Sequence, residues 1–116
     1  MMAAMPGLTV VLVSGDLLLA SRLRAALRDT AVVRLATGGD VPQAENVFVD
    51  LNADVDARIE LIAALRARGN VRIIGFCPHD ARDVRIRAME RGADQVVTNG
   101  ALQEAALRLI GAPSCG

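Results

Sequence analysis

Residues 8–16 read LTVVLVSGD, an apolar run rich in β-branched residues that ends in a polar turn. An unbroken apolar run of this length is typical of a strand buried on both faces, as in parallel sheets. Asp16 has the position of a helix N-cap. Behind it, Leu19, Leu23 and Leu27 recur at helical spacing. The stretch therefore predicts a strand followed directly by a helix, which is the repeating unit of an α/β fold.

The same alternation continues along the chain. Further strands are predicted at 31–36, 46–50, 71–76 and 95–98, and further helices at about 55–68, 78–91 and 101–110. Between 37 and 45 there is room for at most one helical turn. This pattern predicts a doubly wound five-stranded parallel sheet of flavodoxin-like order 2-1-3-4-5, with a shortened second helix. At 116 residues we expect a single domain over 1–116, with an ordered core at about 8–111.

Composition excludes several kinds of function. All 13 basic residues are Arg, which excludes Schiff-base chemistry, a phosphate-binding loop lysine and a lysine general base. The net charge is zero and Phe48 and Phe76 are the only aromatic residues, so neither nucleic acid nor a membrane surface is an expected partner. Cys77 and Cys115, with one His, are too few for a disulfide framework or a zinc site. The absence of a signal-peptide pattern or a long apolar stretch favours the cytoplasm.

Doubly wound sheets bind ligands at the carboxyl ends of their strands, near the switch point between strands 1 and 3. The residues expected at this edge are Ser14, Gly15, Asp16, Asp50, Asn52, Cys77 and Asn99. Asp50 is the leading candidate because it ends an apolar strand, where a carboxylate must be solvated, paired or reactive. The alternative is that Asp50 or Asn52 simply caps the following helix.

Three segments carry a resemblance to a known family: Val10-Val11-Leu12-Val13, Val47-Phe48-Val49-Asp50 and Arg91-Gly92-Ala93-Asp94-Gln95-Val96-Val97. Over 9–110 the chain resembles the receiver domain of bacterial two-component response regulators. The resemblance places Asp50 where receivers carry their phosphorylated aspartate. It places Asn52 where a main-chain carbonyl helps to hold Mg²⁺.

Other receiver landmarks are replaced. The two adjacent acids that end the first strand read Ser14-Gly15, and the lysine after the fifth strand reads Asn99. The hydroxyl residue that ends the fourth strand reads Cys77, or Phe76 if one gap is allowed. The aromatic switch residue reads Val96. Only Asp16 and Asp50 remain as weak candidates for a metal, so Mg²⁺ affinity should be poor and no cofactor is expected.

Phosphoryl transfer depends on positioning and charge neutralisation. We therefore do not expect conventional phosphorylation of Asp50, and the sequence indicates a non-enzymatic pseudo-receiver in signalling. Its partner would be another protein or a second copy, bound through the face formed by the helix at 78–91, the strand at 95–98 and the helix at 101–110. Arg82, Arg85 and Val96 are the candidate interface residues. In the helix at 78–91 we expect an Asp83–Arg87 ion pair on a solvated face.

Three alternatives remain open. The strand-end rim could bind a small molecule or an anion. A second alternative is a receiver that is still phosphorylated at Asp50 despite weakened metal binding. The third is a hydrolase built on Cys77 and His79, although neighbours on a turn often point apart.

Overall fold

The computed structural model describes residues 8–38 and 40–111 and contains five parallel strands in the order β2-β1-β3-β4-β5. The strands are β1 (Leu8–Val13), β2 (Ala31–Ala36), β3 (Asn46–Asp50), β4 (Arg72–Cys77) and β5 (Gln95–Thr98). The predicted doubly wound sheet and its strand order are therefore confirmed. The predicted bounds of β4 were one residue too early.

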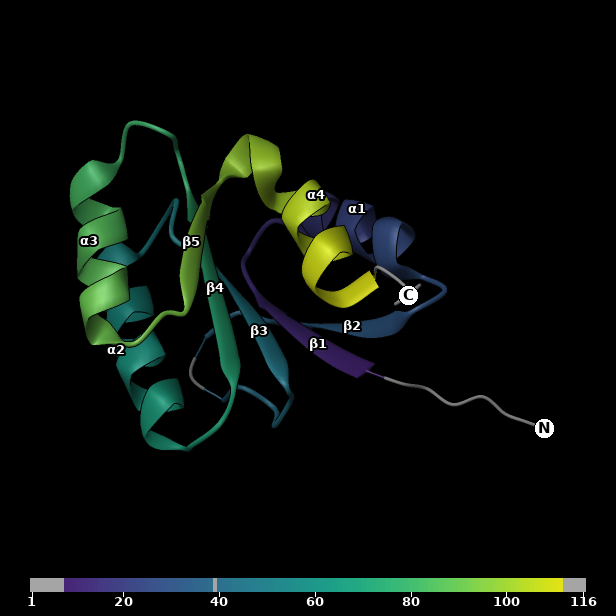
Figure 1. The fold of residues 1–116 in the computed structure, drawn as a ribbon, viewed down its shortest axis with the longest axis horizontal. Helices are drawn as coiled ribbons and strands as arrows, with labels where there is room; N and C mark the ends of the chain where they lie inside the picture. Colours follow the sequence, from purple (N-terminus) through teal and green to yellow (C-terminus); the bar gives the residue numbers. More distant parts are fainter. Residues whose placement is uncertain (1–7, 39, 112–116) are drawn as a thin grey trace.

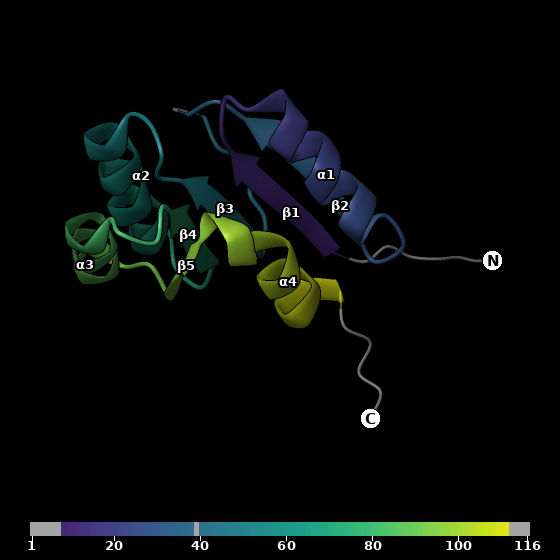
Figure 2. The same ribbon diagram turned by 90° about the horizontal axis from the view of Figure 1, so that it is seen from above.

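Helices cover both faces of the sheet (Figures 1 and 2). One face carries α1 (Leu17–Leu27) and α4 (Leu102–Ala106), and the other carries α2 (Val55–Ala67) and α3 (Arg82–Arg91). A 3₁₀ turn, η1 (Asn99–Ala101), precedes α4, and a π-helical turn, η2 (Leu107–Gly111), follows it. None of the helices in 8–38 and 40–111 is long and apolar enough to cross a membrane.

Two apolar clusters fill the space between sheet and helices. Val10, Leu12, Phe48 and Ile74 face α1 and α4, while the alternate residues of the same strands face α2 and α3. This two-sided burial explains the unbroken apolar runs in the sequence. Gly75 in β4 leaves room for the Leu51 side chain in the cluster that faces α2 and α3, because a Cβ at residue 75 would lie 2.8 Å from Leu51 Cδ1.

The crossover from β2 to β3 contains no helix in its described residues, 37–38 and 40–45. Two arginines hold it in place, one within α2 and one at its C-cap: Arg58 donates to Thr37 O at 3.3 Å, and Arg68 donates to Val41 O at 3.0 Å. Val41 is 5% exposed and belongs to the apolar cluster beneath. A single buried side chain and two arginine contacts thus take the place of a second crossover helix.

Helix α3 begins later than the sequence predicted. Pro78 O accepts a bond from Ala81 N at 3.0 Å, which closes a turn. The helix therefore starts at Arg82, one turn after Pro78, instead of using Pro78 as its first residue. The predicted final helix at 101–110 is also more varied than expected, since only its middle is α-helical.

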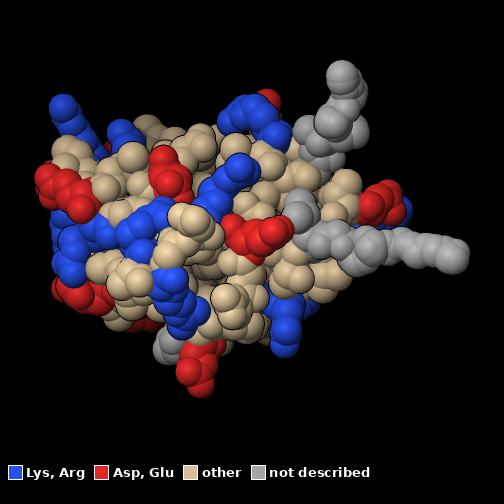
Figure 3. All heavy atoms as spheres, turned by 60° about the horizontal axis from the view of Figure 1, so that its bottom comes forward, with Lys and Arg blue, Asp and Glu red and all other residues tan. Residues whose placement is uncertain are grey.

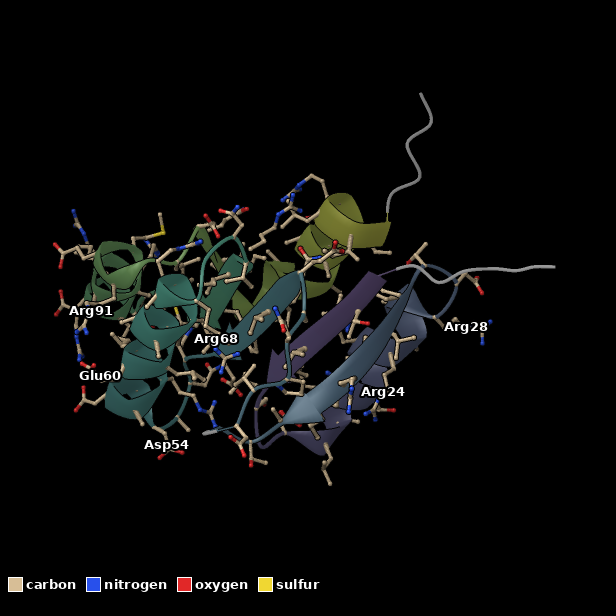
Figure 4. All side chains as sticks on the ribbon, turned by 90° about the horizontal axis from the view of Figure 1, so that it is seen from below. Arg24, Arg28, Asp54, Glu60, Arg68 and Arg91 are labelled. Atoms are coloured by element: carbon tan, nitrogen blue, oxygen red, sulfur yellow. The ribbon has the colours of Figure 1, made fainter. Side chains whose placement is uncertain are left out.

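Charged side chains join α3 to α2. Arg87 binds Asp56 at 2.6 Å, and Arg91 binds Glu60 through two bonds of 2.9 and 3.0 Å. Arg91 and Glu60 meet between the two helices in Figure 4. The predicted Asp83–Arg87 pair was therefore wrong, because Arg87 reaches the neighbouring helix instead of its own preceding turn.

Candidate functional site

The carboxylate of Asp50 lies at the carboxyl end of β3 and is held by uncharged donors. Ser14 Oγ donates to its Oδ2 at 2.7 Å, and its Oδ1 accepts bonds from the main-chain N and side-chain Nδ2 of Asn52 at 2.8 and 2.7 Å. Asp50 is 8% exposed and Ser14 is fully buried. A buried carboxylate needs such donors, since unpaired burial of its charge is costly. Here the protein supplies all of the bonds from two neighbouring loops.

Asn52 extends this network to the far side of the sheet edge. Its side-chain amide pairs reciprocally with that of Asn99, through Nδ2–Oδ1 distances of 2.9 and 2.8 Å. Asn99 follows β5, and β4 lies between β3 and β5 in the sheet. The amide pair therefore links two loops that are not neighbours in the sheet.

Ser14 and Asp16 order the loop that leaves β1. Ser14 Oγ accepts a bond from Asp16 N at 3.0 Å while donating to Asp50. The Asp16 carboxylate caps α1 by accepting bonds from Leu18 N and Leu19 N, both at 3.0 Å. The predicted N-cap is confirmed, and it commits one oxygen of Asp16 to the helix terminus.

A buried arginine braces the same edge from the α2 side. Arg58 is 7% exposed and donates to Asp50 O at 2.9 Å and to Val13 O at 3.3 Å, besides its bond to the β2 exit. Arg58 was not among the residues predicted from the sequence. The signal was its spacing, since Arg58 falls three residues after Val55 and four before Ile62, on the inward face of α2.

A cleft of about 310 Å³ opens beside Asp50, between α1 and the start of α4. Its polar wall contains Asp50, Asn52, Asn99, Asp16 and Arg22. Its apolar wall consists of Leu18, Leu19, Phe76 and Leu102. Four of the residues predicted at the strand ends thus meet in one cleft. Arg22 and the apolar wall had no sequence signal, because helix and strand residues far apart in the chain form it.

Cys77 was predicted in this cleft but lies elsewhere. It is 1% exposed and packs in the apolar cluster under α2 and α3, so Phe76 contributes to the cleft instead. Side chains alternate along a strand, which puts these two neighbours on opposite faces. Gly15 is exposed on the β1–α1 turn and has no side chain to offer.

The geometry does not favour the alternative of a hydrolase built on Cys77 and His79. Burial raises the pKa of the Cys77 thiol, and Asp80 raises it further, while Arg85 acts in the opposite direction. The thiolate is the nucleophilic form, so this environment suppresses nucleophilic chemistry at neutral pH. His79 is exposed on the turn before α3, whereas Cys77 is buried.

The donor set at Asp50 does not fit the Mg²⁺ ion that receivers bind. Both oxygens of Asp50 already accept protein hydrogen bonds, and Ser14 and Gly15 stand where receivers supply carboxylates. Mg²⁺ requires near-octahedral oxygen ligation and carboxylate charge. Within residues 8–38 and 40–111, no group of three or more His, Cys, Asp or Glu side chains is placed to hold a metal ion.

The predicted interface residues lie on one side of α3 and on β5. A helix turns about 100° per residue. Arg87 faces α2. Arg82, Arg85 and Met89 therefore lie on roughly the opposite side of α3. Val96 is half-buried on β5 and packs against the apolar cluster that lies under α2 and α3. Ile86 and Met89 are each 45% exposed, so the surface combines apolar and cationic groups.

Comparison with known proteins identifies the fold. No family model matches the chain, and no curated protein matches its sequence. Solved structures do match. The receiver domain of the TMAO respiratory system response regulator TorR superimposes with a TM-score of 0.77 at 24% identity, covering 89% of this chain and 93% of that one.

Two further solved structures agree. A CheY-like protein (tadZ) from Pseudomonas aeruginosa has a TM-score of 0.75 at 18% identity, covering 90% of this chain and 91% of that one. A response regulator from Burkholderia pseudomallei, solved with a phosphorylated aspartic acid and a calcium ion, has a TM-score of 0.74 at 24% identity. The alignment covers 87% of this chain and 65% of that protein. The chain has the receiver fold, and the predicted resemblance is confirmed.

Proposed function

We propose that this chain is a non-enzymatic interaction module of two-component signalling that works without Mg²⁺-dependent phosphorylation of Asp50. The receiver fold supports the signalling role. The hydrogen bonds of Asp50 support the second part. Its two carboxylate oxygens accept hydrogen bonds from Ser14 and Asn52, both uncharged, so the protein's own donors hold the carboxylate in place.

Attack of Asp50 on a phosphorus atom would first require these bonds to break. The new phosphoryl charge would then meet Asn99, where receivers place a lysine, and Ser14 and Gly15, where they place metal-binding acids. Phosphoryl transfer depends on such charge neutralisation. Losing one electrostatic element costs on the order of 10²–10³ in rate in well-studied enzymes, and several elements are replaced here.

An amide NMR titration tests this proposal. The uniformly ¹⁵N-labelled chain is titrated with Mg²⁺ and then with beryllofluoride, which mimics an aspartyl phosphate. We expect no shifts centred on Asp50 at millimolar Mg²⁺ and none in α3 after beryllofluoride. Shifts that start at Asp50 and spread to α3 would contradict the proposal and identify a working phosphorylation switch.

A restored variant provides the positive control. Gly15→Asp with Asn99→Lys returns a carboxylate to the β1 turn and an amine to the end of β5. A Cβ at Gly15 would meet nothing within 4 Å, and Asn99 is exposed, so both positions have room for these side chains. This variant should show Mg²⁺ shifts that the natural chain lacks.

The partner surface that we propose consists of Arg82, Arg85, Ile86, Met89 and Val96. Arginine and methionine are enriched at protein interfaces. Acidic and basic side chains interleave on the face shown in Figure 3, so this face has no large region of one sign that would suit a polyanion. Arg85→Glu with Met89→Ser should abolish capture of the partner, or self-association, without changing the circular dichroism spectrum. Unchanged association would exclude this face.

A second function is favoured by the cleft itself. Its volume of about 310 Å³ is at the lower end of the range for small-molecule sites. Its combination of apolar and polar walls is also typical of such sites. Native mass spectrometry of the purified chain tests for a retained ligand. A ligand that is present in the natural chain and absent after Phe76→Ala would establish binding in the cleft. If the measured mass equals that of the chain alone, both before and after dialysis against a metabolite extract, small-molecule binding in the cleft is excluded.

A further inference from the structure

Asn99-Gly100 is the only Asn-Gly pair in the chain, and it follows β5 directly. We propose that Asn99 is a site of spontaneous deamidation, and that the Asn52 side chain restrains the reaction. The product would place a carboxylate in the hydrogen-bond network of Asp50. The inference does not depend on the proposed signalling role.

The reaction needs only water. The main-chain nitrogen of Gly100 loses its proton and attacks Cγ of Asn99, a new C–N bond forms, and the bond to the side-chain nitrogen breaks. Ammonia leaves and a cyclic imide remains. Water then adds to one of the two imide carbonyls and opens the ring, which yields aspartate or isoaspartate. No oxidant, reductant or cofactor takes part.

The local structure leaves this attack open. Asn99 and Gly100 are both exposed and belong to η1, a three-residue 3₁₀ turn. Short 3₁₀ turns have poor hydrogen-bond geometry and resist distortion less than an α-helix does. A Cβ at residue 100 would meet nothing within 4 Å, and Gly100 is not among the residues with positive φ. Neither packing nor backbone geometry therefore requires glycine there, while glycine leaves the attacking nitrogen unhindered.

The amide pair acts as the restraint. Asn99 Nδ2 donates to Asn52 Oδ1 at 2.8 Å, and Asn99 Oδ1 accepts from Asn52 Nδ2 at 2.9 Å. Cγ of Asn99 must turn toward Gly100 to react, which breaks both bonds. Each exposed hydrogen bond contributes modestly to stability, so the pair slows the reaction without preventing it.

Deamidation would change the hydrogen bonds between residues 52 and 99. A carboxylate at residue 99 has no N–H to offer, so Asn52 Oδ1 loses its donor and faces a negatively charged oxygen. The amide group of Asn52 would then be shared between two carboxylates, that of Asp50 and the new one. The link between the β3 and β5 loops would weaken, and the charge beside Asp50 would become more negative.

Peptide mass spectrometry over a time course at mildly alkaline pH tests the proposal on the intact folded chain. The peptide containing Asn99 should gain the mass of an amide-to-acid conversion at least roughly tenfold faster than the peptide containing Asn70, which is exposed and precedes Val71. Gly100→Ala should slow the reaction by a similar factor while the fold is retained. Asn52→Ala should accelerate it about fivefold, because both restraining bonds are gone.

Four results would each overturn a part of the proposal. Equal rates at Asn99 and Asn70 would remove the site. An unchanged rate in Gly100→Ala would show that the imide route is not used. An unchanged rate in a folded Asn52→Ala chain would remove the restraint, and if that variant does not fold, Asn52→Ser serves in its place. Amide spectra of Asn99→Asp should then show shifts at Asn52 and Asp50, and an unaltered spectrum would overturn the proposed effect on the network.

Discussion

The two edges of the sheet each depend on one carboxylate, and they treat charge differently. At the amino edge, Asp94 binds the guanidinium of Arg66 directly at 2.6 Å and also accepts a bond from Ile73 N at 2.8 Å. At the carboxyl edge, the carboxylate of Asp50 binds only Ser14 and Asn52. The nearby cation, Arg58, binds main-chain carbonyls instead.

Asp94 therefore belongs to a structural ion pair, whereas the carboxylate of Asp50 is held by hydrogen bonds and has no cation bound to it within residues 8–38 and 40–111. Asp94 and Arg66 are half-exposed, where ion pairs cost little to form and contribute little. Asp50 is buried, and its charge is balanced by hydrogen bonds from neutral groups. A carboxylate held this way fixes loop geometry well, but neither of the groups that bind it carries a positive charge that would stabilise an added phosphoryl group. The comparison predicts graded effects for variants at the two edges.

The largest effect is expected for Arg58→Met. The substitution keeps much of the side-chain volume and removes three donors, so the carbonyls of Val13, Thr37 and Asp50 lose a partner at the buried strand ends. We expect a loss of about 2–4 kcal/mol in the free energy of unfolding, measured by urea denaturation with circular dichroism. Arg68→Met is the matched control at the C-cap of the same helix and should cost less, since Arg68 makes one such bond, to Val41 O. Equal losses would contradict the bracing role of Arg58.

Asp50→Ala should follow, with a loss of about 2 kcal/mol. The fully buried hydroxyl of Ser14 would keep its proton without an acceptor at Oδ2, and Asn52 N would lose its partner. Asp50→Asn keeps the shape and one acceptor oxygen, so it should lose roughly half as much. Under the proposed function, Asp50→Asn also retains partner binding. Loss of partner binding in this variant, with the fold intact, would argue that the charge of Asp50 is needed.

Arg66→Met tests the amino edge and should cost about 1–2 kcal/mol. Arg66 binds Gly92 O and Val71 O at 3.0 Å each, besides Asp94. Because the pair with Asp94 is half-exposed, part of the effect should disappear at 1 M salt, where the Debye length is about 3 Å. The effect of Asp50→Ala should not depend on salt in this way. Equal salt dependence at both edges would remove the distinction between them.

Arg91→Gln should change stability by no more than about 0.5 kcal/mol. Its pair with Glu60 has side chains that are 44% and 68% exposed, so solvent and salt screen it. A double-mutant cycle with Glu60→Gln measures the coupling energy. A coupling energy above about 1 kcal/mol would show that the contact between α2 and α3 is much stronger than exposed pairs usually are.

The smallest effect concerns pH and Cys77. Because burial raises the folded-state pKa of this thiol above its ordinary value of 9.0, the unfolded chain releases the proton first as pH rises. Stability relative to Cys77→Ala should therefore be constant below pH 9.0 and decline above it. Alkylation of the peptide containing Cys77 in the folded chain should be slow at neutral pH. Rapid alkylation there would restore the nucleophile hypothesis.

The sequence by itself determined the strands, their order and the identity of the central acid. Unbroken apolar runs, helical spacing and short connections are local signals, and a parallel α/β fold has few ways to connect them. The bounds of β1, β2, β3 and β5 followed from these signals. The departures from the receiver landmarks at Ser14, Gly15 and Asn99 were equally readable in the sequence, because they are residue identities at fixed positions.

Tertiary structure alone decided how the site is held. Asn52 and Asn99 are 47 residues apart and follow strands that do not touch, so no local pattern could pair them. The side of the sheet on which Cys77 is buried depends on how β4 is oriented between the two helix layers. The partner of Arg87 lies on another helix, and the role of Arg58 depends on three separate strand ends. Hydrogen bonds between distant segments are set by the distances that the packed core fixes, and those distances exist only once the sheet and its helices have come together.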